Sequence, residues 1–293
     1  MKVRFAVAPA AGLLSGPEIV DFADTLEASG FDGVWLSDLP LRAVIDPLLG
    51  LSLIAGRSTR LKLGANVVPL GRNPFLLAKG LAQLDQLSGG RLLLSFVPGL
   101  DEPGEREVLG WQGASRGAVL EEVLATVRAW WSQGRRAGQT PTPHLPDAVV
   151  RPAQNPLEVW LGGRGPKALE RVGRVADGWL GALVDPNEAR AARVAIQQSA
   201  ERAGRAFDPE HFGISIAYAR AAPSDEQLLG MRARRQDVDP LVLLPVGADS
   251  LRSLLGRYVD AGLSKFVLRP ATKTSGWSEE IEWLADAVLD MQS

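Results

Sequence analysis

The sequence has no cysteine and only two histidines, His144 and His211, among 293 residues. Without thiols the chain cannot form zinc ribbons, iron–sulfur clusters, disulfide scaffolds or a cysteine nucleophile, and two histidines so far apart exclude the HExxH zinc motif. The net charge is also small, −2, because the chain has 32 basic and 34 acidic residues. There is therefore no global attraction to nucleic acid or to an anionic membrane.

Long hydrophobic runs are absent as well. No segment reaches the roughly 18 uninterrupted apolar residues that a membrane span needs. Residues 1–16 have the basic and then apolar character of a signal peptide, but Pro9 interrupts the run, and Val3, Phe5 and Val7 alternate as in a strand. We therefore expect a first strand here and a cytoplasmic protein with no membrane or nucleic-acid partner.

The chain does contain 31 glycines and 20 prolines, which separate its apolar and amphipathic segments at regular intervals. Short apolar segments alternate with amphipathic ones that often start with proline, whose missing N–H costs nothing in the first helical turn. The expected strands are Val3–Ala8, Gly33–Ser37, Leu61–Val68, Arg91–Val97, Leu157–Leu161, Gly178–Leu183, Phe212–Tyr218 and Lys265–Leu268. The expected helices begin near Pro17, Pro47, Pro74, Ser115, Pro166, Pro186, Asp249 and Ser278.

Eight such pairs predict an α/β fold, a (β/α)8 TIM barrel in which residues 1–293 form a single domain. A doubly wound open sheet is the alternative. Two irregular stretches, residues 134–155 and 221–245, are predicted to be loop insertions, the second with a short helix at Asp225–Arg235. Substrate specificity would lie in these two insertions.

Active residues of such barrels gather at the carboxyl ends of the strands. Asp38 ends the second expected strand, where it could position a substrate, hold a cofactor hydroxyl or cap its own loop. Asn66 interrupts an otherwise buried strand and needs a partner, because burying an unpaired amide is costly. The rule nominates Ala8, Pro9, Ser37, Asp38, Asn66, Val67, Pro98, Gly99, Gly162, Gly163, Arg164, Gly165, Ala182, Tyr218, Arg220 and Arg269.

The strongest local motif is the glycine-rich segment Leu161–Pro166, between an expected strand and a helix. Glycines allow backbone N–H groups to approach a phosphate, the helix N-terminus adds partial positive charge, and Arg164 could add a bidentate contact. The motif predicts a phosphate-binding turn; a tight turn with an exposed arginine is the alternative. It also matches a dinucleotide fingerprint weakly, with Asp185 as the ribose-binding acid, but Pro166 removes an N–H from that site.

A second glycine motif, Gly113–Gly117, matches the GxSxG pattern of serine hydrolases. A nucleophile elbow needs a strand directly before its serine, whereas a polar loop precedes Ser115. We therefore expect Ser115 to cap a helix.

A further set of segments resembles a known family. The segments are Leu63–Pro69, Arg72–Lys79, Leu84–Arg91, Val159–Gly163, Ala176–Leu180 and Tyr258–Gly262. In this order, and over nearly the whole chain, they are similar to the bacterial-luciferase-like superfamily of flavin- or deazaflavin-dependent barrel oxidoreductases.

The resemblance implies that the barrel binds the deazaflavin coenzyme F420 or, alternatively, FMN. The phosphate would lie near Gly162–Gly165, and Asn66, Val67, Pro98 and Gly99 would complete the cofactor-binding set. The resemblance also implies a bulge in the third strand with a non-prolyl cis peptide, here Asn66–Val67, behind the coenzyme ring. The expected partners are a small-molecule substrate, a second copy of the chain in a homodimer and, with FMN, a flavin reductase.

Two departures from the family pattern narrow the activity. Leu39 follows Asp38 where deazaflavin dehydrogenases of the family often carry histidine, and Gly99-Leu100 stands where relatives place a glutamate. These departures count against sugar-phosphate dehydrogenase chemistry. We expect hydride transfer between F420 and a small organic substrate, with Asp38 as the candidate catalytic residue. The alternatives are an FMN-dependent monooxygenase and a catalytically silent flavin-binding barrel.

Overall fold

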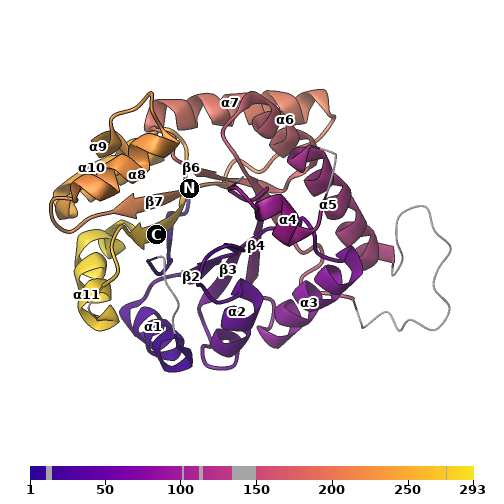
Figure 1. Ribbon diagram of the computed structural model, residues 1–293, viewed down its shortest axis with the longest axis horizontal. Helices are drawn as coiled ribbons and strands as arrows, with labels where there is room; N and C mark the ends of the chain where they lie inside the picture. The colour runs from indigo at the N-terminus through magenta and orange to yellow at the C-terminus, as the bar shows by residue number, and fades with distance from the viewer. Residues whose placement is uncertain (11–14, 101, 112–114, 134–149, 275) are drawn as a thin grey trace.

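Eight parallel strands close into a barrel in the order of the sequence (Figure 1). The structure, a computed structural model, describes residues 1–10, 15–100, 102–111, 115–133, 150–274 and 276–293. The strands are β1 (Arg4–Val7), β2 (Gly33–Ser37), β3 (Lys62–Val67), β4 (Leu92–Phe96), β5 (Val159–Gly162), β6 (Gly178–Ala182), β7 (Phe212–Tyr218) and β8 (Lys265–Pro270). The predicted TIM barrel is confirmed, and closure of the sheet rules out the doubly wound alternative.

Helices surround the barrel on its outside (Figure 1). Six of the described helices carry proline in the first turn, the five predicted ones and α9, and Asp46, Asn73 and Asp185 accept backbone N–H bonds as N-caps. The helices are α1 (Gly16–Ser29), α2 (Pro47–Ala55), α3 (Pro74–Leu87), α4 (Glu105–Leu109), α5 (Arg116–Gln133), α6 (Pro166–Val175), α7 (Pro186–Arg202), α8 (Asp225–Arg234), α9 (Pro240–Leu243), α10 (Gly247–Asp260) and α11 (Trp277–Val288).

The main hydrophobic core lies between the strands and the helices, and a smaller apolar cluster fills the barrel. Inside the barrel, glycines make room for indole rings. A Cβ at Gly64 would lie 2.0 Å from the Trp35 ring, and one at Gly178 would lie 2.3 Å from the Trp160 ring. Trp179 is fully buried in the main core. The three tryptophans therefore belong to the two apolar clusters.

The insertion at residues 221–245 carries the expected helix, α8, followed by the short α9. Most of the other predicted insertion, residues 134–149, lies outside the described residues. Helix α4, directly after β4, was not predicted. Among the helices that the structure describes, none is both long enough and apolar enough to cross a membrane.

The cis peptide expected at Asn66–Val67 is a wrong prediction, because the cis bond within the described ranges is Asn155–Pro156. The third strand has no bulge at this place. Asn66 and Val67 stand in regular parallel register with Ser95 and Phe96 of β4, and the ladder continues where Val97 donates its N–H to the Val67 carbonyl at 2.9 Å. An uninterrupted ladder on this side keeps the strand straight to its end.

Candidate functional site

Three polar side chains form a row across neighbouring strands at the carboxyl end of the barrel. Ser37 of β2 is in register with Asn66 of β3, which is in register with Ser95 of β4. The Asn66 Nδ2 donates a hydrogen bond to the Ser37 Oγ at 3.0 Å. The Asn66 Oδ1 and the Ser95 Oγ are buried and have no partner within the described chain. Unpaired buried polar atoms are costly, so this row is suited to a ligand with matching polar atoms.

Asp38, the residue after β2, is buried in an ionic cluster beside this row. Its Oδ2 accepts bonds from the Val68 N–H at 3.1 Å and from Arg72 at 2.8 Å, while Arg72 also contacts Asp46 at 2.9 Å. Burial raises the pKa of the Asp38 carboxyl above its ordinary value, although Arg72 and the Val68 N–H act in the opposite direction. Asp38 thus fixes the loops after β2 and β3 and borders a cavity of about 350 Å3.

The turn after β4 contains Pro98 and Gly99, both predicted to bind the cofactor. Gly99 has a φ of +81°, and a Cβ there would lie 2.6 Å from Glu105 Oε1. Glu105 accepts the Leu100 N–H at 3.1 Å, and Arg116 donates to the Pro98 and Gly99 carbonyls at 3.4 and 3.3 Å. Glu105 is buried. It therefore places a carboxylate near the end of β4, where the family pattern has a glutamate and this sequence has Gly99-Leu100.

The predicted phosphate-binding turn lies between β5 and α6. Gly163 has a φ of +117°, and its carbonyl accepts the indole N–H of Trp179 at 2.9 Å, which fixes the orientation of the turn. No side chain caps the first turn of α6, which begins after Gly165. A Cβ at Gly165 would meet nothing within 4 Å. The turn therefore combines an uncapped helix N-terminus with open space, which suits an anion.

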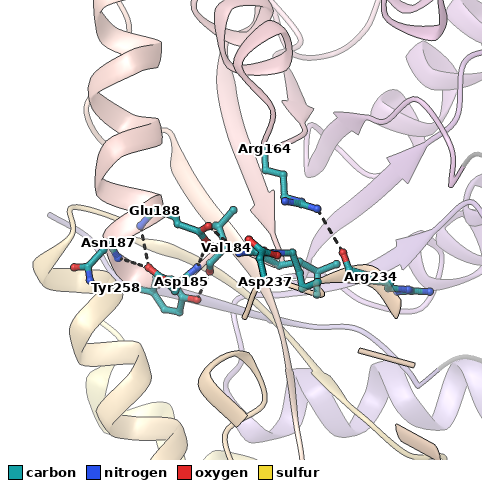
Figure 2. A network of polar contacts seen from close by, with 10 residues as sticks. Arg164, Val184, Asp185, Asn187, Glu188, Arg234, Asp237 and Tyr258 are labelled. Atoms are coloured by element: carbon teal, nitrogen blue, oxygen red, sulfur yellow. Dashed lines mark hydrogen bonds and ion pairs between the residues drawn. The ribbon is translucent and has the colours of Figure 1, made fainter. Parts of the chain in front are cut away.

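The side chain of Arg164 does not turn into the barrel but reaches the end of α8, where it donates to the Arg234 carbonyl at 3.4 Å (Figure 2). The weak dinucleotide interpretation fails here. The sheet is closed, and Asp185 accepts the Asn187 and Glu188 N–H groups as the N-cap of α7 (Figure 2).

Cavities lie at both ends of the barrel and on its outside, and the one at the carboxyl end is the candidate site. One cavity of about 240 Å3 opens there against β1, β2 and β8 and contains Ser37, Trp35 and Arg269. A cavity of about 310 Å3 lies at the opposite end, among residues near the strand starts such as Arg4 and Lys62. A groove of about 560 Å3 lies outside the barrel between α6 and α7. Barrel enzymes place their chemistry at the carboxyl end, which favours the first cavity.

The structure brings some predicted residues together and separates others. Ser37, Asn66 and Arg269 face the barrel mouth, whereas the Val67 side chain is buried in the outer core. Ser95 and Arg234 were missed, although the inward alternation of β4 could have indicated Ser95. Ser115 precedes α5, and its Oγ accepts the Ala118 N–H at 3.2 Å. This bond confirms the predicted cap; Gly113 and Ala114 lie outside the described residues.

Known proteins similar to the chain are oxidoreductases. The sequence model of the luciferase-like monooxygenase family matches residues 3–237. A 5,10-methylenetetrahydromethanopterin reductase of Methanolobus tindarius is 28% identical over 203 residues, which are 69% of this chain and 60% of that protein. A phthiodiolone/phenolphthiodiolone dimycocerosates ketoreductase of Mycobacterium tuberculosis is 33% identical over 162 residues, 53% of this chain and 42% of that protein. The matches thus span less than two thirds of both relatives.

Solved structures share the whole fold. An F420-dependent secondary alcohol dehydrogenase, in complex with an F420–acetone adduct, superposes with a TM-score of 0.82 at 16% identity, and both chains are covered in full. The oxygenating constituent of 3,6-diketocamphane monooxygenase from Pseudomonas putida, in complex with FMN, has a TM-score of 0.77 at 16% identity, with 100% of this chain and 99% of that chain covered. At these identities the likeness concerns the fold alone.

Proposed function

Because the chain belongs to the luciferase-like monooxygenase family, we propose that it is an oxidoreductase that transfers hydride between coenzyme F420 and a small organic substrate. The observation that carries the proposal is the polar row at the barrel mouth. Asn66 Oδ1 and Ser95 Oγ are buried without partners there, an acceptor and a hydroxyl beside each other in register. The carbonyl and N–H groups on the edge of a flavin or deazaflavin ring match these two atoms.

The phosphate of the coenzyme is assigned to the turn Gly162–Gly165. Backbone donors at an uncapped helix N-terminus recognise a phosphate without a lysine or a metal. The described residues bring together no group of three or more histidine, aspartate or glutamate side chains that could hold a metal ion. The row lies on β2, β3 and β4, and the turn follows β5, the next strand of the barrel. Both therefore belong to one continuous part of the barrel rim.

F420 is preferred over FMN for two reasons. One similar curated protein is a methylenetetrahydromethanopterin reductase, and a structural neighbour with full coverage is an F420-dependent alcohol dehydrogenase. The basic residues are also mostly arginine, 26 of 32, a bias that we associate with GC-rich actinobacteria, in which F420 is used. FMN remains the alternative coenzyme, since another structural neighbour holds FMN.

When bound, the coenzyme supplies the hydride chemistry, and the chain contributes position and shielding from water. Ser37, Asn66 and Ser95 would hold one edge of the ring through β2, β3 and β4. Asp38 holds the neighbouring loops in place through Arg72. The bound coenzyme would supply or accept the hydride at a substrate carbon, and solvent would supply or accept the proton at the adjacent oxygen.

The test is equilibrium binding of F420 and of FMN to the purified protein, followed by fluorescence. We expect submicromolar affinity for F420 and weaker binding of FMN. The variant Gly165→Val fills the open space at the phosphate turn without backbone strain, because Gly165 has a φ of −75°. It should weaken binding of both coenzymes by at least about tenfold, as loss of a charge-assisted contact does.

The control is Gly256→Ala in α10, where an added Cβ also meets open space but lies far from the turn. It should bind as the wild type does. Binding of FMN alone, with oxygen consumption in the presence of reduced FMN, would replace the proposal with a monooxygenase that depends on a flavin reductase. Binding of neither coenzyme would indicate a catalytically silent barrel, and unchanged affinity in Gly165→Val would remove the phosphate assignment.

A further inference from the structure

The cavity of about 240 Å3 at the barrel mouth has an unusual charge. Three arginines line it, Arg42, Arg234 and Arg269, and no carboxylate of the described residues does. The rest of its lining is the hydroxyl of Ser37 and apolar groups, among them Leu39, Val44, Ile45, Leu100 and the ring of Trp35. A small, mostly apolar cavity with three cations at its wall is suited to one anionic group on a short carbon skeleton.

Arg269 is the central cation. It lies near the carboxyl end of β8, and its guanidinium has neither a hydrogen bond nor an ion pair with any part of the chain that the structure describes. Burial lowers the pKa of its guanidinium, and the nearby charge of Arg234 lowers it further. A largely desolvated cation without a counter-ion is unfavourable for folding and is stabilised by an anion.

Arg234 ends α8 and reaches the cavity from the insertion at residues 221–245. Two contacts hold its backbone in place. Arg164 donates to the Arg234 carbonyl at 3.4 Å, and the next residue, Arg235, is buried and ion-paired with Glu188 and Asp237, each at 2.8 Å (Figure 2). The guanidinium of Arg234 itself has no partner in the described ranges, whereas Arg42 is paired with Glu102. Two of the three cations are therefore uncompensated.

Trp35 lines this cavity as well as the cavity at the opposite end of the barrel, and its indole N–H is buried without a partner in the described chain. Ser37, also in the lining, is hydrogen-bonded to Asn66 and so joins this cavity to the row that holds the coenzyme ring. A molecule held by Arg269 would thus lie beside the site of hydride transfer.

We propose that Arg269 and Arg234 bind a carboxylate or phosphate group of the substrate, so that the enzyme acts on a small organic acid or phosphate ester. That the anion belongs to a substrate of hydride transfer rests on the proposed function, whereas the binding of an anion by these arginines does not depend on it. The turn assigned to the coenzyme phosphate follows β5, three strands from both β2 and β8 in the ring, and it reaches this site only through the contact of Arg164 with the Arg234 carbonyl. Arg269 of β8 is therefore the residue that distinguishes the substrate anion from the coenzyme phosphate. Bidentate arginine contacts would fix the orientation of the anion and present the remaining carbon skeleton to the ring.

The experiment measures the binding of inorganic phosphate and of acetate to the coenzyme-free protein by calorimetry at constant ionic strength. We expect a site that binds both acetate and phosphate and loses at least about tenfold in affinity in Arg269→Gln, whereas phosphate bound at the turn Gly162–Gly165 should be unaffected by this substitution. The matched control is Arg4→Gln, which changes an arginine of β1 at the opposite end of the barrel. It should keep the anion affinity of the wild type. Equal affinity in wild type and Arg269→Gln would overturn the proposal.

A second arm separates the substrate anion from the coenzyme phosphate. FMN and riboflavin, which lacks the phosphate, are compared in Arg269→Gln. We expect both to bind as they do to the wild type, and phosphate to bind also after the coenzyme is loaded. Selective weakening of FMN would overturn the proposal, because Arg269 would then hold the coenzyme. If anions bind through Arg269 but neither coenzyme binds, the redox function fails and the anion site stands; the reverse result removes only the anion site.

Discussion

At the scale of single residues, the barrel mouth holds polar groups that the folded chain leaves without partners. They are Asn66 Oδ1, Ser95 Oγ and the guanidinium of Arg269, on β3, β4 and β8, with nothing in the described structure to pair them. Elsewhere, with the exception of Arg193 Nε on α7, the described chain pairs such groups: buried Arg235 has two carboxylate partners, and buried Tyr218 donates to Glu280 at 2.7 Å. The unpaired groups therefore mark the site at which function is favoured over stability.

Replacing Arg269 by methionine should stabilise the coenzyme-free protein. The substitution keeps the length and packing of the side chain but removes a desolvated charge that has no counter-ion in the described chain. We expect a gain of about 1 kcal/mol in the free energy of unfolding. Thermal denaturation should show it as a rise of about 2 °C in Tm. A lower Tm in Arg269→Met would mean that the guanidinium already stabilises the empty site.

Ser95→Ala should separate ligand binding from folding at the polar row. The Oγ of Ser95 has no partner within the described residues, so its removal should leave the Tm of the coenzyme-free protein unchanged or slightly higher. If this hydroxyl contacts the coenzyme ring, F420 affinity should fall about fivefold, as one hydrogen bond predicts. Ser199→Ala, which removes a hydroxyl bonded to the Glu170 carbonyl, is the opposite control: it should lower Tm and leave coenzyme affinity unchanged.

The sequence could identify some of these residues and not others. Asn66 and Arg269 stand out because a polar residue in an apolar strand, or at its carboxyl end, is conspicuous in the pattern. Ser95 is less conspicuous: the alternation of β4 indicates that it faces the inside of the barrel, but only the register with Asn66 gives it a place in the row. Arg234 could not be assigned, because its position depends on how an insertion folds back over the barrel.

At the scale of elements, a buried arginine, Arg235, is one of the contacts that attach the insertion with α8 and α9 to the barrel. Arg235 is 2% exposed and donates to Glu188, Asp237 and the Leu183 carbonyl. The Leu183 carbonyl belongs to a turn in which Leu183 has a φ of +56°, and the next carbonyl, of Val184, accepts the Tyr258 hydroxyl at 2.6 Å. The insertion thus rests on the turn between β6 and α7.

Arg235→Met should loosen this insertion without unfolding the barrel. Loss of the ion pairs leaves Glu188 and Asp237 to solvent, since both are partly exposed, so we expect a loss of about 2 kcal/mol. Limited proteolysis should cut within residues 221–245, and anion affinity should fall because Arg234 is no longer held over the cavity. Arg232→Met, an exposed change on the same helix, should cause neither effect. Cleavage at the same rate as in wild type would exclude the anchoring role.

The contact of α1 with the loop before β3 predicts a dependence of stability on pH. Burial acts to raise the pKa of Glu27, but the backbone N–H groups of Arg60 and Thr59 outweigh it, and the pKa is lowered. A carboxyl with a lower pKa in the folded state stabilises the protein above its unfolded pKa of about 4.3, and the contribution is lost as the pH falls. Glu27→Gln should therefore lower Tm at pH 7 by about 2 °C, a small effect because the group is largely solvated.

Thermal denaturation of Glu27→Gln and the wild type from pH 7 to pH 3 checks this prediction. The difference in Tm should shrink as the pH falls below the unfolded pKa and disappear once the carboxyl is protonated in the folded state as well. A difference that stays constant with pH would assign the effect to shape rather than charge.

The helices and strands were predictable because local signals agree with the fold. Proline in the first turn, with Asp46, Asn73 or Asp185 before it, specifies where a helix begins, independently of tertiary contacts. Helix α4 was missed because its five residues are too short to show a helical period. The cis bond at Asn66–Val67 was expected from family resemblance, which carries over a backbone detail that the regular pairing of this strand with β4 does not support.

At the scale of the whole molecule, the barrel follows from the alternation of elements, whereas the positions of side chains at its mouth follow from closure. Parallel strands joined by helices must cross over with the same hand, so eight similar units curl in one direction until β8 pairs with β1. The register of the strands in the closed barrel determines which inward-facing side chains lie next to one another at its mouth. It places Arg269 of β8 against Ala8 and Ser37 of the first strands, far away in sequence.

The outer surface of the closed barrel leads to a final prediction, that two copies associate through α2 and α3. Leu49 and Leu53, one helical turn apart on α2, are 68% and 42% exposed, and Leu76 and Leu87 on neighbouring α3 are 63% and 71% exposed (Figure 1). Exposed leucines on adjacent helices are typical of a subunit interface, and a two-fold axis would bury the same residues of both copies. The wild type should therefore have twice the chain mass of 31.3 kDa in sedimentation at micromolar concentration.

The double variant Leu49→Glu/Leu76→Glu should sediment as single chains. At protein concentrations low enough for the wild type to dissociate, both proteins should have the same Tm, because the two side chains are exposed and contribute little to the core of one barrel. Leu229→Glu on α8, an equally exposed leucine away from these helices, should remain dimeric. A wild type with the mass of one chain would show that this apolar surface has no self-association role at such concentrations. A double variant that stays dimeric would move the interface to another face of the barrel, since paired glutamates at a two-fold axis repel each other.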